Sequence, residues 1–137
     1  MIHYTIGDKK FKGQANCEAK LILDGRFLQQ DYNSRLQGKP FHVIQLLGYD
    51  SVRKKSIEIK IDNWSTGLMH NEGTISDTGK VITNSGEHLD PSTQKPYKLR
   101  TVTTILDHDH FTLEWFHIKD GGQEEKVVSM THTRKLP

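Results

Sequence analysis

Hydrophobic and polar residues alternate along most of the chain. In the segment 57–62 three isoleucines share one face and the charged residues share the other, and Phe111, Leu113 and Trp115 align in the same way. A period of two is typical of a strand that has a core on one side and water on the other. No segment carries a sustained helical stripe, so the pattern predicts strands throughout.

Turn signals separate these alternating segments. Asp24-Gly25, Gly38-Lys39-Pro40 and Asp120-Gly121-Gly122 are examples, and a spacing of about 13 residues leaves room for a strand of roughly ten residues and a tight turn. Glycine accepts the positive φ that tight hairpin turns require. The pattern predicts ten strands, over residues 2–6, 10–22, 26–36, 40–49, 55–62, 69–77, 79–88, 97–107, 110–119 and 123–134.

Ten consecutive strands with mostly short connections favour a single all-β domain over residues 1–137, built as an antiparallel up-and-down β-barrel. Closing the sheet removes exposed edges that would otherwise promote aggregation. A sandwich is disfavoured because its Greek-key crossings need long connections, and only residues 89–97 form a long loop-like stretch.

Composition and charge narrow the function classes. The 29 β-branched residues against two alanines argue against a helical protein. A formal net charge of +2 gives no reason to expect nucleic acid or an anionic membrane as a partner. No apolar stretch approaches the roughly 20 residues that cross a bilayer, and residues 1–6 lack a signal-peptide pattern, which together predict a cytoplasmic protein. The single cysteine, Cys17, excludes an internal disulfide and is expected to be a small buried hydrophobic residue.

Several short motifs, taken in order, resemble an uncharacterised bacterial family of calycin-like domains of unknown function. They include Asp24-Gly25-Arg26-Phe27-Leu28, Gly38-Lys39-Pro40-Phe41 and Leu47-Gly48-Tyr49-Asp50, and the agreement continues to Thr133-Arg134. The resemblance implies a lipocalin-like or fatty-acid-binding-protein-like antiparallel barrel and brings no established activity. The chain departs from the family pattern by largely lacking a longer amino-terminal segment and by having His132 where an aromatic residue is common.

The inner face of the barrel is assigned where the alternation is clean. A barrel of this size holds a small ligand if its inward side chains leave space, and the alternative is a core packed solid. The inner face is predicted to carry Ile57, Ile59 and Ile61 on 55–62, then Phe111, Leu113, Trp115 and His117 on 110–119, and Phe41, Val43, Gln45, Leu47 and Tyr49 on 40–49. The candidate ligand-binding residues in the lumen are Gln45, Tyr49, Ile59, Arg100, Trp115, His117, His132 and Arg134.

Arginine is included because fatty-acid-binding barrels bind a ligand carboxylate through a buried guanidinium group. Arg26, Arg100 and Arg134 are candidates for that role, and Arg134 shares a strand face with His132. The alternative is exposed charge near the ends of strands, where arginine is usually found.

Histidine suggests a second kind of site. Either His117 or His132 could ligate haem, as in the related barrels called nitrobindins, although hairpin geometry places His117 opposite a residue near Lys126 and not opposite His132. His108 and His110 alternate with aspartates that could ligate a metal, but they mark a tight turn and no third ligand is evident. No metal site is therefore predicted, and His70 and His88 are expected to be exposed.

Catalytic motifs are absent from the sequence. There is no nucleophile elbow and no glycine-rich phosphate loop, and the carboxylates of Asp62 and Glu114 are expected on the outer face. The sequence therefore favours non-enzymatic binding of a small hydrophobic or amphipathic molecule, with no cofactor. A haem- or metal-binding barrel and a homodimeric interaction module without a ligand are the alternatives.

Overall fold

The computed structural model describes residues 2–6 and 9–135, with side chains described from Lys9 onward. Residues 1, 7, 8, 136 and 137 of the predicted domain lie outside this description. The described part contains eleven strands and no helix: β1 (Ile2–Ile6), β2 (Lys9–Gly13), β3 (Ala15–Ile22), β4 (Phe27–Leu36), β5 (Lys39–Asp50), β6 (Lys55–Asp62), β7 (Met69–Ile75), β8 (Val81–Leu89), β9 (Pro96–Ile105), β10 (His110–Ile118) and β11 (Glu124–Thr133).

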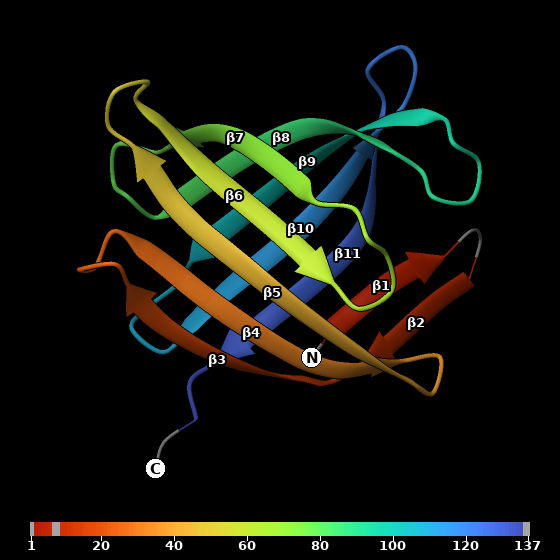
Figure 1. The fold of residues 1–137 in the computed structure, drawn as a ribbon, viewed down its shortest axis with the longest axis horizontal. Helices are drawn as coiled ribbons and strands as arrows, with labels where there is room; N and C mark the ends of the chain where they lie inside the picture. The colour runs from red at the N-terminus through yellow and green to blue at the C-terminus, as the bar shows by residue number, and fades with distance from the viewer. Residues whose placement is uncertain (1, 7–8, 136–137) are drawn as a thin grey trace.

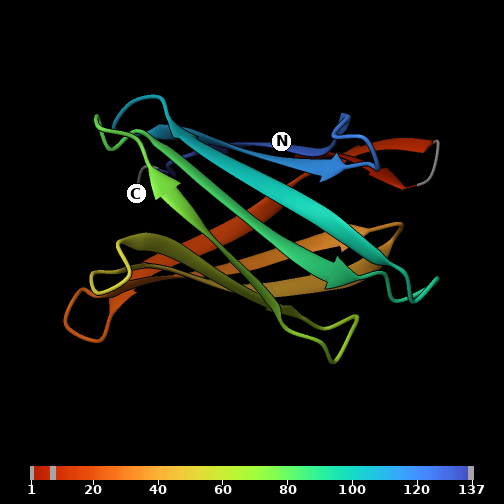
Figure 2. The ribbon, with the colours of Figure 1, turned by 90° about the horizontal axis from the view of Figure 1, so that it is seen from above.

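All eleven strands form one antiparallel sheet in the order β2-β1-β11-β10-β9-β8-β7-β6-β5-β4-β3. The sheet curls so that β4, β5 and β6 cross in front of β8 to β11 (Figure 1), and the view from above shows the two layers facing each other (Figure 2). The predicted all-β, calycin-like up-and-down architecture is confirmed. Nearly every strand pairs with its neighbour in sequence, because the tight turns leave no room for crossovers.

One predicted strand, 10–22, is two strands in the structure. β2 and β3 stand at opposite ends of the sheet order, although only Gln14 separates them in sequence. A chain that bends sharply can leave one edge of a sheet and join the other, which is how corners form in curled sheets. The amino-terminal segment thereby connects the two edges of the sheet.

Glycines occupy the predicted hairpin turns in the backbone conformation expected of them. Gly25 has φ of 79°, and Gly121 and Gly122 have φ of 88° and 84°. An L-residue with a Cβ rarely adopts this region, so these positions explain why the turns lie where the sequence predicted them.

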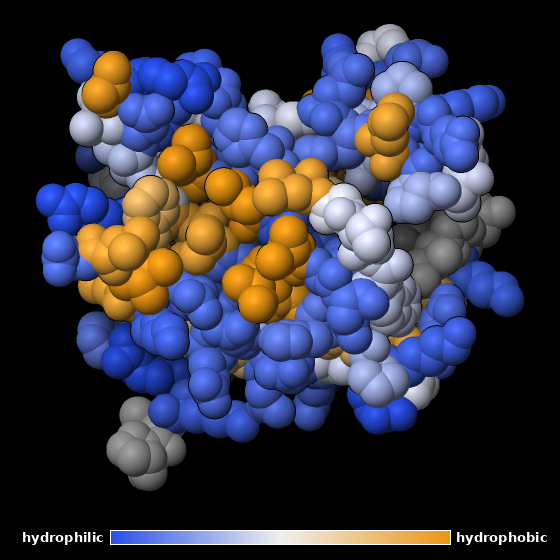
Figure 3. All heavy atoms as spheres, viewed as in Figure 1, coloured by the Kyte–Doolittle hydropathy of each residue, from blue (hydrophilic) through white to orange (hydrophobic). Residues whose placement is uncertain are grey.

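The isoleucines of β6 face outward, so the predicted inward orientation of Ile57, Ile59 and Ile61 is wrong. Glu58 between them is only 3% exposed, whereas Ile61 is 43% exposed. Alternation separates two faces of a strand but does not say which face is inside, and here hydrogen bonds satisfy a polar inner face. Apolar side chains consequently gather on the outer surface over the front strands (Figure 3).

Few apolar side chains are fully buried among the described residues. The buried hydrophobic residues are Tyr32, Val43, Leu99 and Leu113. The accessible surface is 9613 Å², against about 7,300 Å² expected for a monomer of this mass. Large hydrophobic side chains in turns and on the outer face, such as Val52 and Ile61, contribute to this surplus, and Trp115 and His117 on the concave wall are only partly buried.

Candidate functional site

The structure brings four of the eight predicted lumen residues to the concave side of the sheet and places a fifth at its end. Gln45 is buried, and Trp115, His117 and His132 are partly buried on inner-facing positions. Tyr49 lies at the end of β5, where it is 52% exposed. It lines an open pocket of about 330 Å³ together with Lys54, Thr74 and Ile75.

All three candidate arginines lie outside the concave side, so the assignment of Arg100 and Arg134 to the lumen is wrong. Arg26 is exposed in the turn before β4, where it lies 3.6 Å from Asp24. Arg100 alternates with the buried residues Leu99 and Thr101, which forces its side chain onto the outer face. There its guanidinium donates to both carboxylate oxygens of Glu124 at 2.8 and 2.6 Å. Arg134 is exposed beyond β11, where its Nε lies 3.2 Å from Asp109. Ile59 is excluded by the outward orientation of its face of β6.

A buried carboxylate organises the middle of the concave wall. Glu58 on β6 accepts a hydrogen bond from Asn71 Nδ2 at 2.8 Å and bonds from Thr101 Oγ1 at 3.2 and 3.3 Å. These donors come from β7 and β9, so the carboxylate joins both layers of the curled sheet. A buried carboxylate without such donors would be strongly destabilising.

The same network reaches a histidine that sequence analysis expected to be exposed. Because Asn71 donates to Glu58 through Nδ2, its Oδ1 is an acceptor, and His88 Nε2 lies 2.7 Å from it. His88 therefore carries its proton on Nε2. A Cβ on Gly86 would overlap Asn71 Oδ1, so the glycine leaves the space that this contact needs. Burial, together with the charge of Lys60, lowers the pKa of His88.

Lys60 spans the concave side toward the opposite layer. Its ammonium lies 3.5 Å from Asp62 and 4.7 Å from the centre of the Trp115 ring on β10. Burial lowers the pKa of Lys60, whereas the nearby carboxylates act in the opposite direction. Asp62, which was predicted to face outward, shares the inner face of β6 with Glu58 and Lys60.

Aromatic and imidazole rings line the end of the concave wall where β8, β9 and β10 meet. The Tyr97 ring centre lies 5.0 Å from that of His117 and 5.8 Å from that of His88. Burial lowers the pKa of His117 and raises that of Tyr97, so both groups are held in the neutral form near neutral pH. His117 pairs in register with Glu125, one residue from the position predicted by hairpin geometry.

His132 belongs to a separate cluster between β4 and β11. Its ring stacks on Phe111 with centres 3.9 Å apart, and Tyr32 Oη lies 2.9 Å from its Nε2. Its Nδ1 is buried and has no hydrogen-bond partner in the described part of the chain. Burial lowers the pKa of His132 to about 4. Cys17 pairs in register with Tyr32, and burial raises the pKa of its thiol.

This environment does not fit a haem ligand at His132. One ring nitrogen is engaged by Tyr32, the other is sealed, and Phe111 covers a ring face. An axial ligand needs a nitrogen that is free to approach the iron and open space for the macrocycle beside it. The structure therefore removes His132 from the haem hypothesis.

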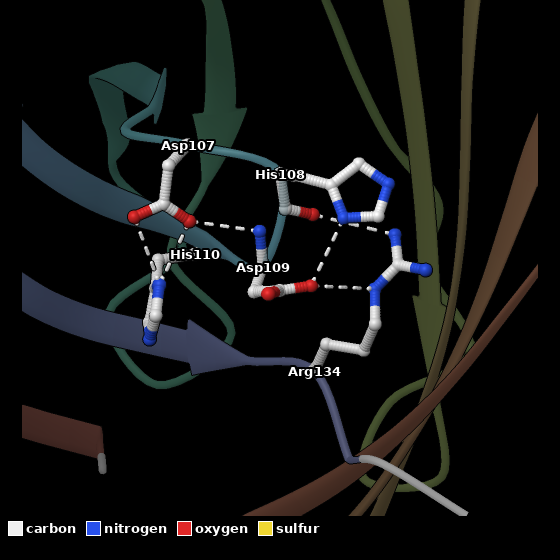
Figure 4. Close-up of polar contacts among 5 residues, drawn as sticks. All are labelled: Asp107, His108, Asp109, His110 and Arg134. Atoms are coloured by element: carbon white, nitrogen blue, oxygen red, sulfur yellow. Dashed lines mark hydrogen bonds and ion pairs between the residues drawn. The ribbon is translucent and has the colours of Figure 1, made fainter.

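The Asp107–His110 segment forms the turn between β9 and β10 (Figure 4). Asp107 accepts the backbone N–H of Asp109 and contacts His110 Nδ1, both at 2.8 Å, which lowers the pKa of Asp107. Arg134 anchors the turn to the end of β11 through Asp109. Over the described residues, no group of three metal-ligating side chains comes together.

The polar residues at the centre of the concave wall, above all Glu58, Asn71 and Thr101, were not predicted from the sequence. One sequence signal could have indicated Asn71. Asn71-Glu72-Gly73 and Asn84-Ser85-Gly86 repeat the pattern Asn-x-Gly in neighbouring strands. A glycine two residues after an asparagine lies on the same strand face and leaves space beside it, which marks a polar inner wall.

Comparisons with known proteins assign a family. In the described residues, no helix meets the length and hydropathy needed to cross a membrane. No curated protein matches the chain. Residues 3–134 match the family described as "Protein of unknown function (DUF1579)". With nearly its whole length matched, and with the antiparallel barrel-like sheet described above, the chain belongs to this family.

Proposed function

We propose that the protein binds a small amphipathic molecule on the concave side of the sheet and leaves it chemically unchanged. The observation that carries this proposal is that a charged strand face lies opposite an aromatic ring across the concave side. The inner face of β6 is charged, and the ring of Trp115 faces it from β10 with the Lys60 ammonium 4.7 Å away. Ligand sites of this type combine ring surfaces with a few polar groups that set orientation.

Binding is favoured over catalysis because the buried carboxylate on the concave wall, Glu58, already has hydrogen-bond partners. The Glu58 carboxylate accepts hydrogen bonds from Asn71 and Thr101. A general acid or base must reach a proton of the substrate, whereas a carboxylate held in this way acts as a structural acceptor.

The fluorescence of Trp115 tests the proposal. The protein has two tryptophans, and Trp64 lies in an exposed loop against Phe41. A Trp64→Phe variant therefore leaves Trp115 as the sole reporter, and Trp115→Phe is the matched control. We expect 1-decanoylglycerol to shift the emission of the first variant and not that of the second. Native mass spectrometry of protein purified from cells should also find a bound small molecule. No spectral shift with any amphipathic probe, together with only unliganded protein in native spectra, contradicts the proposal.

Haem binding is the second candidate and now depends on His117. Its imidazole is half-buried and its lowered pKa keeps it neutral, which is the form that ligates iron. A titration with hemin separates the two functions. A shifted haem absorbance band that disappears in a His117→Ala variant would support haem, and an unshifted band excludes it.

The outer apolar face is smaller than the interface of a stable homodimer. Its contiguous members across β3 to β6 are Ile22, Phe27, Ile44, Leu46, Ile57, Ile59 and Ile61. Strand spacings give each outward residue about 33 Å², so the seven cover roughly 230 Å² of sheet. Stable dimers bury about 800 Å² on each partner, so this face would need further contacts to form one.

A further inference from the structure

We propose that Gln30, Gln45 and Lys60 form the subsite for the ligand's head group, and that this head group is uncharged and carries both hydrogen-bond donors and acceptors. The inference rests on the proposed binding function and specifies the chemistry of the ligand. We call these three residues the amide row.

The amide row is continuous across three strands. Gln30 on β4 pairs in register with Gln45 on β5, and Gln45 pairs with Lys60 on β6. Neighbouring strands lie about 4.8 Å apart, so the row spans roughly 10 Å, the size of a small polar head group. The buried residues Tyr32 and Val43 lie two positions from the glutamines along their strands and establish that this face is the inner one.

Both glutamines are buried, and their side-chain amides form no hydrogen bond with other described residues. Gln30 is 3% exposed and Gln45 is 4% exposed. Neither side chain forms a hydrogen bond with any residue in the described part of the chain, although buried amides are nearly always paired. Within that same part, the fully sealed side-chain atom that lacks a partner is His132 Nδ1, not an amide atom. The glutamine amides therefore keep contact with internal space that water or a ligand can occupy.

The charges beside the row exclude a carboxylate head group. Glu58, Lys60 and Asp62 alternate along the inner face of β6 and sum to one negative charge. A ligand carboxylate would add a negative charge next to two others, and a cationic head group would approach the Lys60 ammonium. A primary amide offers a carbonyl oxygen and an NH₂ group side by side, and hydroxyl and amide groups complement both. Trp115 provides an apolar surface next to Lys60 for the rest of the molecule.

Two probes with the same tail test the head-group assignment. Decanoic acid and 1-decanoylglycerol differ in charge and hydroxyl groups but share their acyl chain. We expect the glycerol ester to raise the thermal midpoint of the protein and to bind at least about tenfold more tightly than the acid, the effect of one good hydrogen bond. Tighter binding of decanoate would overturn the uncharged head group while leaving the proposed binding function intact. Failure of both probes to bind would contradict the binding function itself.

Variants of the glutamines separate a ligand subsite from a structural role. Gln45→Met and Gln30→Met keep the length of the side chain and remove the amide. We expect each to weaken the binding of 1-decanoylglycerol about tenfold, because the head group loses a hydrogen-bond partner. The thermal midpoint of the unliganded protein should not fall, because neither amide bonds to another described residue. The control is Gln29→Met on the outer face, where the amide donates to Asp31 at 2.8 Å and binding should not change. A lower midpoint with unchanged binding in the first two variants would show that the amides are structural.

Discussion

His132 makes the stability of the fold depend on pH, and its surroundings give the size of the effect. Its ring is stacked on Phe111, one nitrogen contacts Tyr32 and the other is sealed with no hydrogen-bond partner among the residues that the structure describes. Burial of this kind disfavours the charged imidazolium and lowers the pKa of His132 from 6.5 to about 4. Acidification is therefore the perturbation that tests the cluster.

The direction of the effect follows from proton binding. Well above pH 6.5 the imidazole is neutral in both states, so His132 contributes no pH dependence there. Below pH 6.5 His132 is protonated in the unfolded chain, but in the folded chain it stays neutral down to about pH 4. The free energy of unfolding therefore falls as the pH drops from 6.5 to 4. At about 1.36 kcal/mol per unit the full shift amounts to roughly 3.4 kcal/mol, and because the ring is partly exposed we expect about 2 kcal/mol.

Urea unfolding of the wild type and a His132→Phe variant at pH 7, 6, 5 and 4 measures this contribution. Phenylalanine keeps the stacked ring and removes the titrating nitrogens. We expect the difference in unfolding free energy between the two proteins to fall by about 2 kcal/mol between pH 7 and pH 4. A His108→Gln variant at the exposed turn should leave the pH dependence unchanged. A difference that stays constant across this range would refute the assignment of a buried neutral imidazole.

Three further substitutions test the placement of residues, each by urea unfolding. Gly73→Ala should lower the free energy of unfolding by about 3 kcal/mol or more, because the new Cβ would overlap the Thr83 carbonyl oxygen. Gly13→Ala is the control and should lower it little, because no atom lies within 4 Å of its Cβ position. Equal losses would contradict the close approach at Gly73. Ile59→Lys should lower the free energy of unfolding by less than about 1 kcal/mol and leave the mass from light scattering unchanged, because the side chain lies on the outer face. A loss above about 3 kcal/mol would show that Ile59 is a core residue. Arg100→Ala should cost about 1 kcal/mol or less and leave binding of 1-decanoylglycerol unaltered, since its ion pair is on the surface; lost binding would place it in the site.

The fold was predictable because turn chemistry and alternation are local properties. Glycines at positions 25, 121 and 122 adopt the positive φ that fixes their turns, and the segments between them are strands. The break between β2 and β3 was not predictable, because the alternation continues through it. The bend at Gln14 depends on how the two edges of the curled sheet meet, which is a property of the whole sheet.

The candidate site was predictable only in part. Trp115 and His117 were placed on the concave side because Phe111, Leu113 and Trp115 align on one face of their strand, with Thr112 and Glu114 on the other. Glu58 was placed outside because an apolar face is normally buried, and this rule fails where several strands supply matching polar groups to one another. Asn71 and Thr101 come from strands far along the chain, so their contact with Glu58 could not be inferred from the spacing within one strand.

The choice of inner face on β6 must be enforced, since a slip of one residue would bury its isoleucines and expose Glu58. Two features of the neighbouring strands oppose that slip. Gly73 on β7 lies where a Cβ would overlap the backbone of Thr83 on β8, which fixes the register of those two strands and so the position of Asn71 beside β6. The hydrogen bonds from Asn71 and Thr101 would also be lost. A glycine and a polar network thus select the register that hydrophobic burial alone would disfavour.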